Sequence, residues 1–168
     1  MESIQPVLAA VSMASIEVRR LSLEQKKSIL FRLSQLLIAN QEIIIQENKK
    51  DLDKMDDSNP KKDRLLLNES RIKDLADSLH DIVKLEDPAG KVLIDNHAEN
   101  GLHIQKITVP MGVVGVIYEA RPNVTIDVAA LCLYAGNAVV LRGGSDAEFT
   151  NKILVKIIHD TLIENGVD

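Results

Sequence analysis

Glu119, Arg121 and Asn123 stand close together in the stretch GVIYEARPNVTID, directly after an apolar segment and before another with helical spacing. Carboxylate, guanidinium and amide groups at the end of a buried strand lie where open α/β sheets bind their ligands. The pattern therefore favours a site for a small molecule. Three ordinary interpretations stay open: Pro122 suits the first position of a helix, Asn123 can cap that helix, and Glu119 can pair with Arg121 in solvent.

A second polar turn, LRGGS, contains Arg142, Gly143, Gly144 and Ser145 and follows the next apolar segment. Helix N-termini carry unpaired N–H groups and partial positive charge, which attract phosphate groups. The two glycines allow a ligand to approach the backbone closely, and the guanidinium suits a phosphate or a ribose edge. The turn has neither the G-x-G-x-x-G spacing nor the P-loop pattern. A tight turn with a surface arginine is therefore an equal alternative.

The elements around these turns are predicted to alternate between strands and helices over residues 110–168. GVVGVIY is a continuous apolar segment, as expected of a strand buried on both faces of a parallel sheet. VTIDVAALCLYA predicts a helix that Gly136 can end, and NAVVL predicts a second buried strand. Ser145 and Glu148 have the spacing of a capping box for a last helix, which ends near Asn165. This β-α-β-α order makes a parallel sheet with both polar turns at its carboxyl edge.

The first half of the chain is predicted to be helical over residues 1–88, followed by a β-hairpin over residues 91–109. Ser22 and Gln25 have capping-box spacing before a stripe of aliphatic residues, and Asn68 can cap a later helix. An Asn-Gly pair between the two predicted strands favours a tight turn. The leucine and isoleucine stripes are expected to form the core.

The composition argues against several classes of protein. The chain has 168 residues, of which 45% are apolar and 27% charged, as in an ordinary globular domain or a piece of a larger one. Aromatic residues make up 2%, and the net charge is −5 with Lys and Arg dispersed, which does not predict a nucleic-acid surface. The N-terminus lacks the basic region of a secretion signal, and no apolar run approaches the roughly 20 residues of a membrane span. We expect a cytoplasmic protein with no nucleic-acid or membrane partner.

Cys132 is the only cysteine, which excludes an internal disulfide and fits a reducing compartment. Its apolar neighbours in AALCLYA should raise the pKa of the thiol, so we expect a packing role rather than a nucleophile. The four histidines are scattered and show no metal-ligand spacing, so no metal site is expected.

Residues 109–151, VPMGVVGVIYEARPNVTIDVAALCLYAGNAVVLRGGSDAEFTN, resemble the N-terminal cofactor-domain segment of the γ-glutamyl phosphate reductase family. That family is part of the aldehyde dehydrogenase superfamily. GVIYEARPNVT, AALCL and GNAVVLRGGS are together highly specific, and DRLLLNESRI and LHIQKITVPMGVVG fit the same family. The resemblance covers nearly the whole chain, but only the N-terminal part of a considerably longer family.

The resemblance implies an α/β fold with an N-terminal helical layer, a β-hairpin arm and the truncated start of a doubly wound, Rossmann-like cofactor domain. It implies NADPH-dependent reduction of L-glutamyl 5-phosphate to L-glutamate 5-semialdehyde and phosphate, in proline biosynthesis. This chemistry uses a thiolate nucleophile, an oxyanion hole and a nicotinamide near the thioester. The family's nucleophile lies downstream of Asp168, so we expect the chain alone to be inactive.

Site residues take their roles from the same resemblance. Asn123 matches the asparagine whose side-chain amide helps to stabilise the oxyanion. The resemblance implies two groups of cofactor-binding residues. The residues beside the nicotinamide ribose are Ala120, Arg121 and Pro122. The residues along the adenosine side are Arg142, Gly143, Gly144 and Ser145. Glu119 and Arg121 alternatively serve the substrate. A homo-oligomer and functional coupling to glutamate 5-kinase are implied for the intact protein.

Two other functions stay open. A different aldehyde dehydrogenase relative would act on another acyl group, whereas a non-catalytic module would keep only nucleotide binding or subunit contacts. Two parallel strands cannot cover the faces and edges of a sheet by themselves, so the sequence is expected to be a fragment. A reading frame that continues to a downstream cysteine would favour the enzyme.

Overall fold

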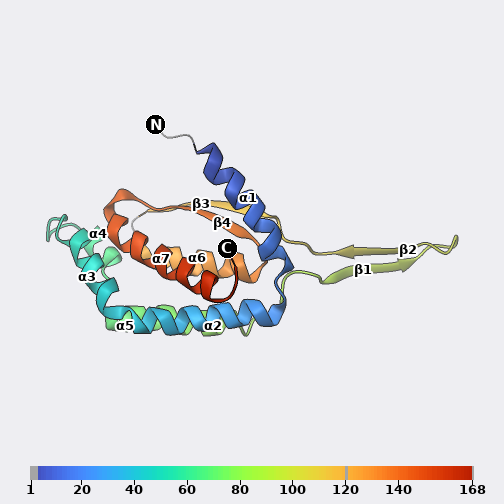
Figure 1. Ribbon diagram of the computed structural model, residues 1–168, viewed down its shortest axis with the longest axis horizontal. Coiled ribbons are helices and arrows are strands. Elements are labelled where there is room, and N and C mark those ends of the chain that lie inside the picture. Colours follow the sequence, from blue (N-terminus) through green and yellow to red (C-terminus); the bar gives the residue numbers. More distant parts are fainter. Residues whose placement is uncertain (1–3, 120, 168) are drawn as a thin grey trace.

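The structure is a computed structural model that describes residues 4–119 and 121–167. Its elements in chain order are α1 (Gln5–Arg20), α2 (Leu23–Ala39), α3 (Gln41–Leu52), α4 (Lys61–Leu65), α5 (Glu69–Ile82), β1 (Val92–His97), β2 (His103–Ile107), β3 (Val113–Ile117), α6 (Pro122–Tyr134), β4 (Ala138–Arg142), the 3-10 helix η1 (Ser145–Ala147) and α7 (Glu148–Glu164). Figure 1 shows a layered body from which the β1–β2 hairpin projects. The predicted order of a helical part, a hairpin arm and a β-α-β-α unit is confirmed.

Two of the N-terminal helices begin at the residues that the sequence indicates. The Ser22 hydroxyl accepts from the Gln25 N–H at 3.2 Å, and the Gln25 side chain accepts from the Ser22 N–H at 2.9 Å. Asn68 caps α5 by accepting a 2.9 Å bond from the Arg71 N–H. These bonds satisfy backbone N–H groups that an uncapped helix would leave free, and each cap stabilises the folded protein by about 1 kcal/mol.

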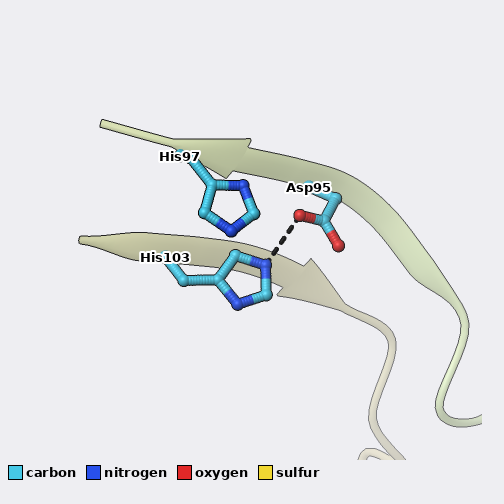
Figure 2. A group of neighbouring side chains, drawn as sticks. All are labelled: Asp95, His97 and His103. Carbon is cyan, nitrogen blue, oxygen red and sulfur yellow. Dashed lines mark hydrogen bonds and ion pairs between the residues drawn. The ribbon is translucent and has the colours of Figure 1, made fainter. Parts of the chain in front are cut away.

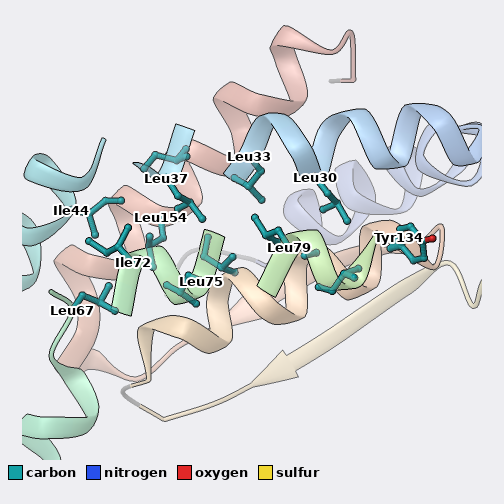
Figure 3. Packing of buried hydrophobic residues seen from close by; sticks show 14 residues of the cluster. Leu30, Leu33, Leu37, Ile44, Leu67, Ile72, Leu75, Leu79, Tyr134 and Leu154 are labelled. Carbon is teal, nitrogen blue, oxygen red and sulfur yellow. The ribbon is translucent and has the colours of Figure 1, made fainter. Parts of the chain in front are cut away.

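The main hydrophobic core lies between two helical layers. The aliphatic stripes of α2 and α5 pack against each other and against α6 and α7, as Figure 3 shows. Its members are nearly all Leu and Ile, and the most buried include Leu30, Leu37, Ile44, Ile72, Leu79, Ile126 and Leu154. Tyr134 also lies there, and its hydroxyl donates a 2.5 Å bond to the Leu85 carbonyl. The predicted aliphatic core is therefore confirmed.

Strands β3 and β4 form a parallel two-stranded sheet in which Val113 pairs with Ala138 and Ile117 with Arg142. α6 connects the strands and packs on β4, and α1 crosses both strands (Figure 1). Gly136 ends α6 with a φ of 79°, as predicted. The expectation that β3 is buried on both faces is wrong, because its residues alternate between exposed and half-buried. Ile117, at the carboxyl end of the strand, is 86% exposed.

The β1–β2 hairpin is antiparallel and separate from the parallel sheet. Its Asn-Gly turn forms as predicted, with Gly101 at a φ of 85°. Every residue of both strands is exposed, and the apolar side chains include Leu93, Ile94, Ile104 and Ile107. The hairpin therefore presents both faces outwards (Figure 1).

The start of α7 differs from its prediction, because η1 replaces the expected capping box of Ser145 and Glu148. Asp51, at the end of α3, caps α7 instead. Its carboxylate accepts from the Phe149 N–H at 3.2 Å and from the Thr150 N–H and hydroxyl at 2.8 Å each. This buried negative charge lies at the positive end of the α7 dipole. A contact between segments so far apart in the sequence cannot be found from local spacing.

No single described helix is long and apolar enough to cross a membrane. α2 and α3 taken together reach the required length and composition, but they meet at 70°. Both helices place apolar residues in the core, among them Leu33, Leu37 and Ile44.

Candidate active site

The polar group after β3 lies at the start of α6. Pro122 stands in the first turn of the helix, and Arg121 is the N-cap residue without a side-chain capping bond. Asn123 is exposed, and its amide nitrogen contacts Asp127 Oδ2 at the long distance of 3.4 Å. The alternative that Asn123 caps the helix is therefore wrong. Its amide is available to donate to a ligand.

The two charged residues before the helix are also exposed. Among the described residues, no ion pair joins Glu119 to Arg121, so the alternative in which they neutralise each other is not what the structure shows. Ala120, which was predicted to lie beside the cofactor, is outside the described residues.

A hydrogen-bond network fixes the two polar turns relative to each other. The hydroxyls of Tyr118 and Thr125 lie 2.6 Å apart, and Thr125 donates to Asn151 Oδ1 at 2.9 Å, so Tyr118 is the donor to Thr125. These residues join the end of β3 to the first turns of α6 and α7. Gly143 fits against the same network, since a Cβ there would lie 2.3 Å from Asn151 Nδ2 and 3.1 Å from Tyr118 Cζ. A side chain at this position would therefore displace the Asn151 amide from the network.

A cavity of about 560 Å³ opens beside Asn123, between the start of α6 and the α4–α5 region. Its polar and charged lining residues are Asp63, Arg64, Arg71, Asp74, Ser78, Arg121, Asn123 and Asp127, and its apolar lining residues are Leu66, Leu67 and Leu75. The volume and the mixed lining suit a small polar molecule. Arg121 and Asn123 are the predicted site residues that the structure brings together here.

Sequence reasoning missed the other lining residues. Asp127 lies four positions after Asn123, so helical spacing places both on one face and could have revealed it. Arg71 and Ser78 come from α5, and no local pattern connects that helix to the start of α6.

The charges in the cavity are unevenly satisfied. Burial raises the pKa of the Asp127 carboxyl, and long contacts of 3.4 Å with Asn123 Nδ2 and Ser78 Oγ lower it only in part. Arg71 is engaged within the chain, because it donates at 2.9 Å to both the Asp63 carboxylate and the Leu66 carbonyl. Asp127 forms no ion pair with another described residue, so its half-buried carboxylate is poorly satisfied.

The second polar turn lies apart from this cavity, at the carboxyl end of β4. Arg142 is exposed, and its guanidinium makes one weak contact of 3.4 Å with the Gly143 carbonyl. Gly144 has a φ of −65°, which any residue can adopt, and Ser145 is exposed. The turn therefore presents the Arg142 guanidinium at the carboxyl edge of the sheet, where open α/β sheets bind ligands.

Cys132 is partly buried in α6, and desolvation raises the pKa of its thiol. A raised pKa reduces the thiolate fraction at neutral pH, which opposes a nucleophilic role. The predicted environment of this cysteine is confirmed.

The histidines are less scattered than the sequence suggests. On the hairpin, three side chains each offer one potential ligand atom, and these atoms lie within 4.8 Å of one another (Figure 2). The three residues are Asp95, His97 and His103. The rings of His97 and His103 stack at 4.3 Å with an angle of 5° between their planes, and His103 Nε2 lies 2.7 Å from the Asp95 carboxylate. Imidazole binds metal through lone pairs in the ring plane, so parallel rings do not converge on one ion. In this geometry the cluster joins the two strands.

The aldehyde dehydrogenase family profile matches residues 2–167 of the chain. The γ-glutamyl phosphate reductase of Pelodictyon phaeoclathratiforme is 46% identical over 99% of this chain and 40% of that protein. The enzyme of the same name from Bacteroides thetaiotaomicron is 46% identical over 92% of this chain and 37% of that protein. The chain thus spans about 40% of the length of the curated relatives it matches.

Solved structures agree with these matches. The γ-glutamyl phosphate reductase of Thermotoga maritima superposes with a TM-score of 0.94 at 32% identity, covering 99% of this chain and 41% of that one. The Saccharomyces cerevisiae protein gives a TM-score of 0.91 at 31% identity, covering 100% and 45%. The predicted truncated dehydrogenase fold is confirmed, and the family is one that uses a nicotinamide cofactor. Because the family profile spans nearly every residue, the chain belongs to the aldehyde dehydrogenase family.

Proposed function

We propose that a protein containing this chain uses NADPH to reduce L-glutamyl 5-phosphate to L-glutamate 5-semialdehyde and phosphate, a cytoplasmic step of proline biosynthesis. The observation that carries the proposal is the exposed amide of Asn123 on the wall of a small-molecule cavity. The identity of 46% to a γ-glutamyl phosphate reductase over 99% of the chain supports this substrate over other acyl groups.

Asn123 is well placed to be an oxyanion donor. It stands in the first turn of α6, and the bond between Tyr118 and Thr125 ties that turn to the end of β3, so the backbone that carries the amide is held in place. Negative charge develops on the acyl oxygen as a thiolate displaces phosphate, and one fixed donor stabilises that charge by about 3–4 kcal/mol. Cys132 is not that thiolate, because burial in α6 raises its pKa. The nucleophile is assigned to another part of the protein.

The cofactor is assigned to the carboxyl edge of the sheet. Its adenosine side would lie along Arg142, Gly143, Gly144 and Ser145, and its nicotinamide ribose beside Ala120, Arg121 and Pro122. The described residues fit such a group, since Arg142 has free donors and Gly144 has no side chain to block an approach. When bound, the cofactor supplies the hydride. These residues bind and orient it.

Glu119 and Arg121 were both candidates for the substrate. Arg121 lines the cavity together with Asn123, whereas Glu119 is not part of that lining. A guanidinium is permanently charged and suits a carboxylate or a phosphate. The cavity position therefore favours Arg121 for an anionic group of the substrate.

The hairpin is assigned to assembly of a homo-oligomer. A two-stranded hairpin open on both faces is only marginally stable, and its exposed apolar residues and edges favour a covering partner. A second copy is the partner we assign. In the intact protein, Ile104→Glu should lower the mass measured by light scattering, whereas Lys106→Gln should not. A monomeric wild type would contradict the assignment.

Functional coupling to glutamate 5-kinase is part of the same proposal, because the substrate is an acyl phosphate that a kinase must supply. The coupling stays a prediction about the intact protein.

The reverse reaction tests the proposed function. A protein that contains this chain and the C-terminal portion found in its relatives is incubated with glutamate 5-semialdehyde and NADP⁺, with and without inorganic phosphate. NADPH formation should require phosphate, because the product is an acyl phosphate. Phosphate-independent oxidation would indicate another aldehyde dehydrogenase activity. Absence of turnover by the folded protein would favour the non-catalytic module.

A further inference from the structure

Asp127 occupies an unusual place in the cavity wall. It lies one helical turn after Asn123 on the same face of α6, and both residues line the cavity of about 560 Å³. Asp127 is half-buried, and its contacts with Asn123 Nδ2 and Ser78 Oγ are both 3.4 Å long. Contacts of this length recover little of the solvation that a carboxylate loses on burial.

Among the described residues, none forms an ion pair with this carboxylate, although Arg64, Arg71 and Arg121 line the same cavity. Arg71 lines the same cavity but is held by Asp63 and by the Leu66 carbonyl. Asp127 forms no ion pair with any described residue, in contrast to Asp87, which is also partly buried and lies 3.0 Å from Lys26 Nζ. A half-buried carboxylate without a partner, open to a cavity, is suited to bind a cationic group of a ligand.

We propose that Asp127 binds the α-ammonium group of the substrate and thereby selects an amino acid derivative. The proposal rests on the proposed function. Asn123 Nδ2 and Asp127 Oδ2 lie 3.4 Å apart, so an oxygen that accepts from the amide and a nitrogen that donates to the carboxylate, each about 2.9 Å from its partner, can lie roughly 5–6 Å from each other. The glutamyl chain spans roughly 5 Å from its reacting carbon to its α-nitrogen at ordinary bond lengths. An acyl oxygen at Asn123 therefore places the ammonium group near Asp127.

The test compares two aldehydes that differ only in this ammonium group. Glutamate 5-semialdehyde carries it, and 5-oxopentanoate has the same chain without it. Phosphate-dependent oxidation of each is measured with wild type, Asp127→Asn and the control Asp74→Asn, all in the intact protein. Asp74 also lines this cavity, so Asp74→Asn removes the same charge from it. Asp74 is exposed, however, so this variant does not alter a half-buried carboxylate. Each variant is compared with wild type on the same aldehyde, so cyclisation of glutamate 5-semialdehyde cancels.

Asp127→Asn should lower kcat/KM for glutamate 5-semialdehyde by roughly 10–100-fold, as expected when a hydrogen-bonded charge pair is lost. Its kcat/KM for 5-oxopentanoate should stay within about twofold of wild type, and Asp74→Asn should change the two aldehydes alike. An equal loss on both aldehydes, or no loss on either, would overturn the role of Asp127 alone. A wild type that oxidises neither aldehyde with phosphate would overturn the proposed function as well.

Discussion

Replacing Asp51 with alanine should remove a large part of the folding free energy of this protein. The Asp51 side chain is 0% exposed and caps α7 from the end of α3. It accepts from the Phe149 N–H at 3.2 Å, from the Thr150 N–H at 2.8 Å and from the Thr150 hydroxyl at 2.8 Å. Alanine would leave these donors without a partner and would open space between two helices.

The size of the effect follows from the two backbone donors and the charge. Each buried donor without a partner costs about 1–3 kcal/mol, and the lost charge at the N-terminus of α7 adds about 0.5–1 kcal/mol. The expected loss is about 2.5–7 kcal/mol, against a total of about 5–15 kcal/mol for an ordinary domain. Asp51→Asn keeps one acceptor oxygen and should lose only about 1–2 kcal/mol.

Urea unfolding followed by circular dichroism measures these differences. Asp53→Ala is the matched control, because Asp53 is an exposed carboxylate two residues away and should change stability by less than about 0.5 kcal/mol. A loss below about 1 kcal/mol for Asp51→Ala, with an unchanged urea dependence, would refute the reasoning. It would show that α7 does not depend on a cap from α3.

Three further predictions concern the site. Asp127→Asn should raise the melting temperature at pH 7 but not near pH 3. Burial raises the pKa of the Asp127 carboxyl in the folded state above 3.8, its value in the unfolded chain, so the ionised carboxylate destabilises the folded state at neutral pH. This penalty disappears as the pH falls below 3.8, where the carboxyl is protonated in both states. Equal shifts at both pH values would contradict this. Gly143→Ala should lower the melting temperature, because the new Cβ would lie 2.3 Å from Asn151 Nδ2. Gly144 has a φ of −65°, which valine can adopt, so Gly144→Val should mainly raise the Kd for NADPH in the intact protein. An unchanged Kd would remove support for the cofactor turn.

Features of the fold that depend on neighbouring residues were predictable from the sequence. The caps at Ser22 and Asn68 are formed by residues within three positions, and the φ of Gly136 follows from its place at the end of an apolar helix. The cap of α7 was mispredicted, because Asp51 is 99 positions from Thr150 and a 3-10 turn displaced the local candidate Ser145.

The site was predictable only where one segment supplies it. Asn123 and Arg121 follow a strand directly, so an apolar segment that ends in polar residues pointed to them. Ser78 and Arg71 reach the same cavity because α5 packs against α6, which is a tertiary contact without a local pattern. The same limit hid the stacked pair of histidines on the hairpin, since their approach depends on the pairing of β1 with β2.

The most direct test of the central claim is the kcat of Asn123→Ala in the intact protein, measured in the phosphate-dependent oxidation of glutamate 5-semialdehyde. Loss of one oxyanion donor should lower kcat by roughly 10²–10³-fold, with little change in melting temperature because Asn123 makes no capping bond. Asn68→Ala serves as the contrasting variant, since it removes the cap of α5 and should lower stability rather than kcat. A near-normal kcat for Asn123→Ala would contradict the assignment of this amide to the oxyanion.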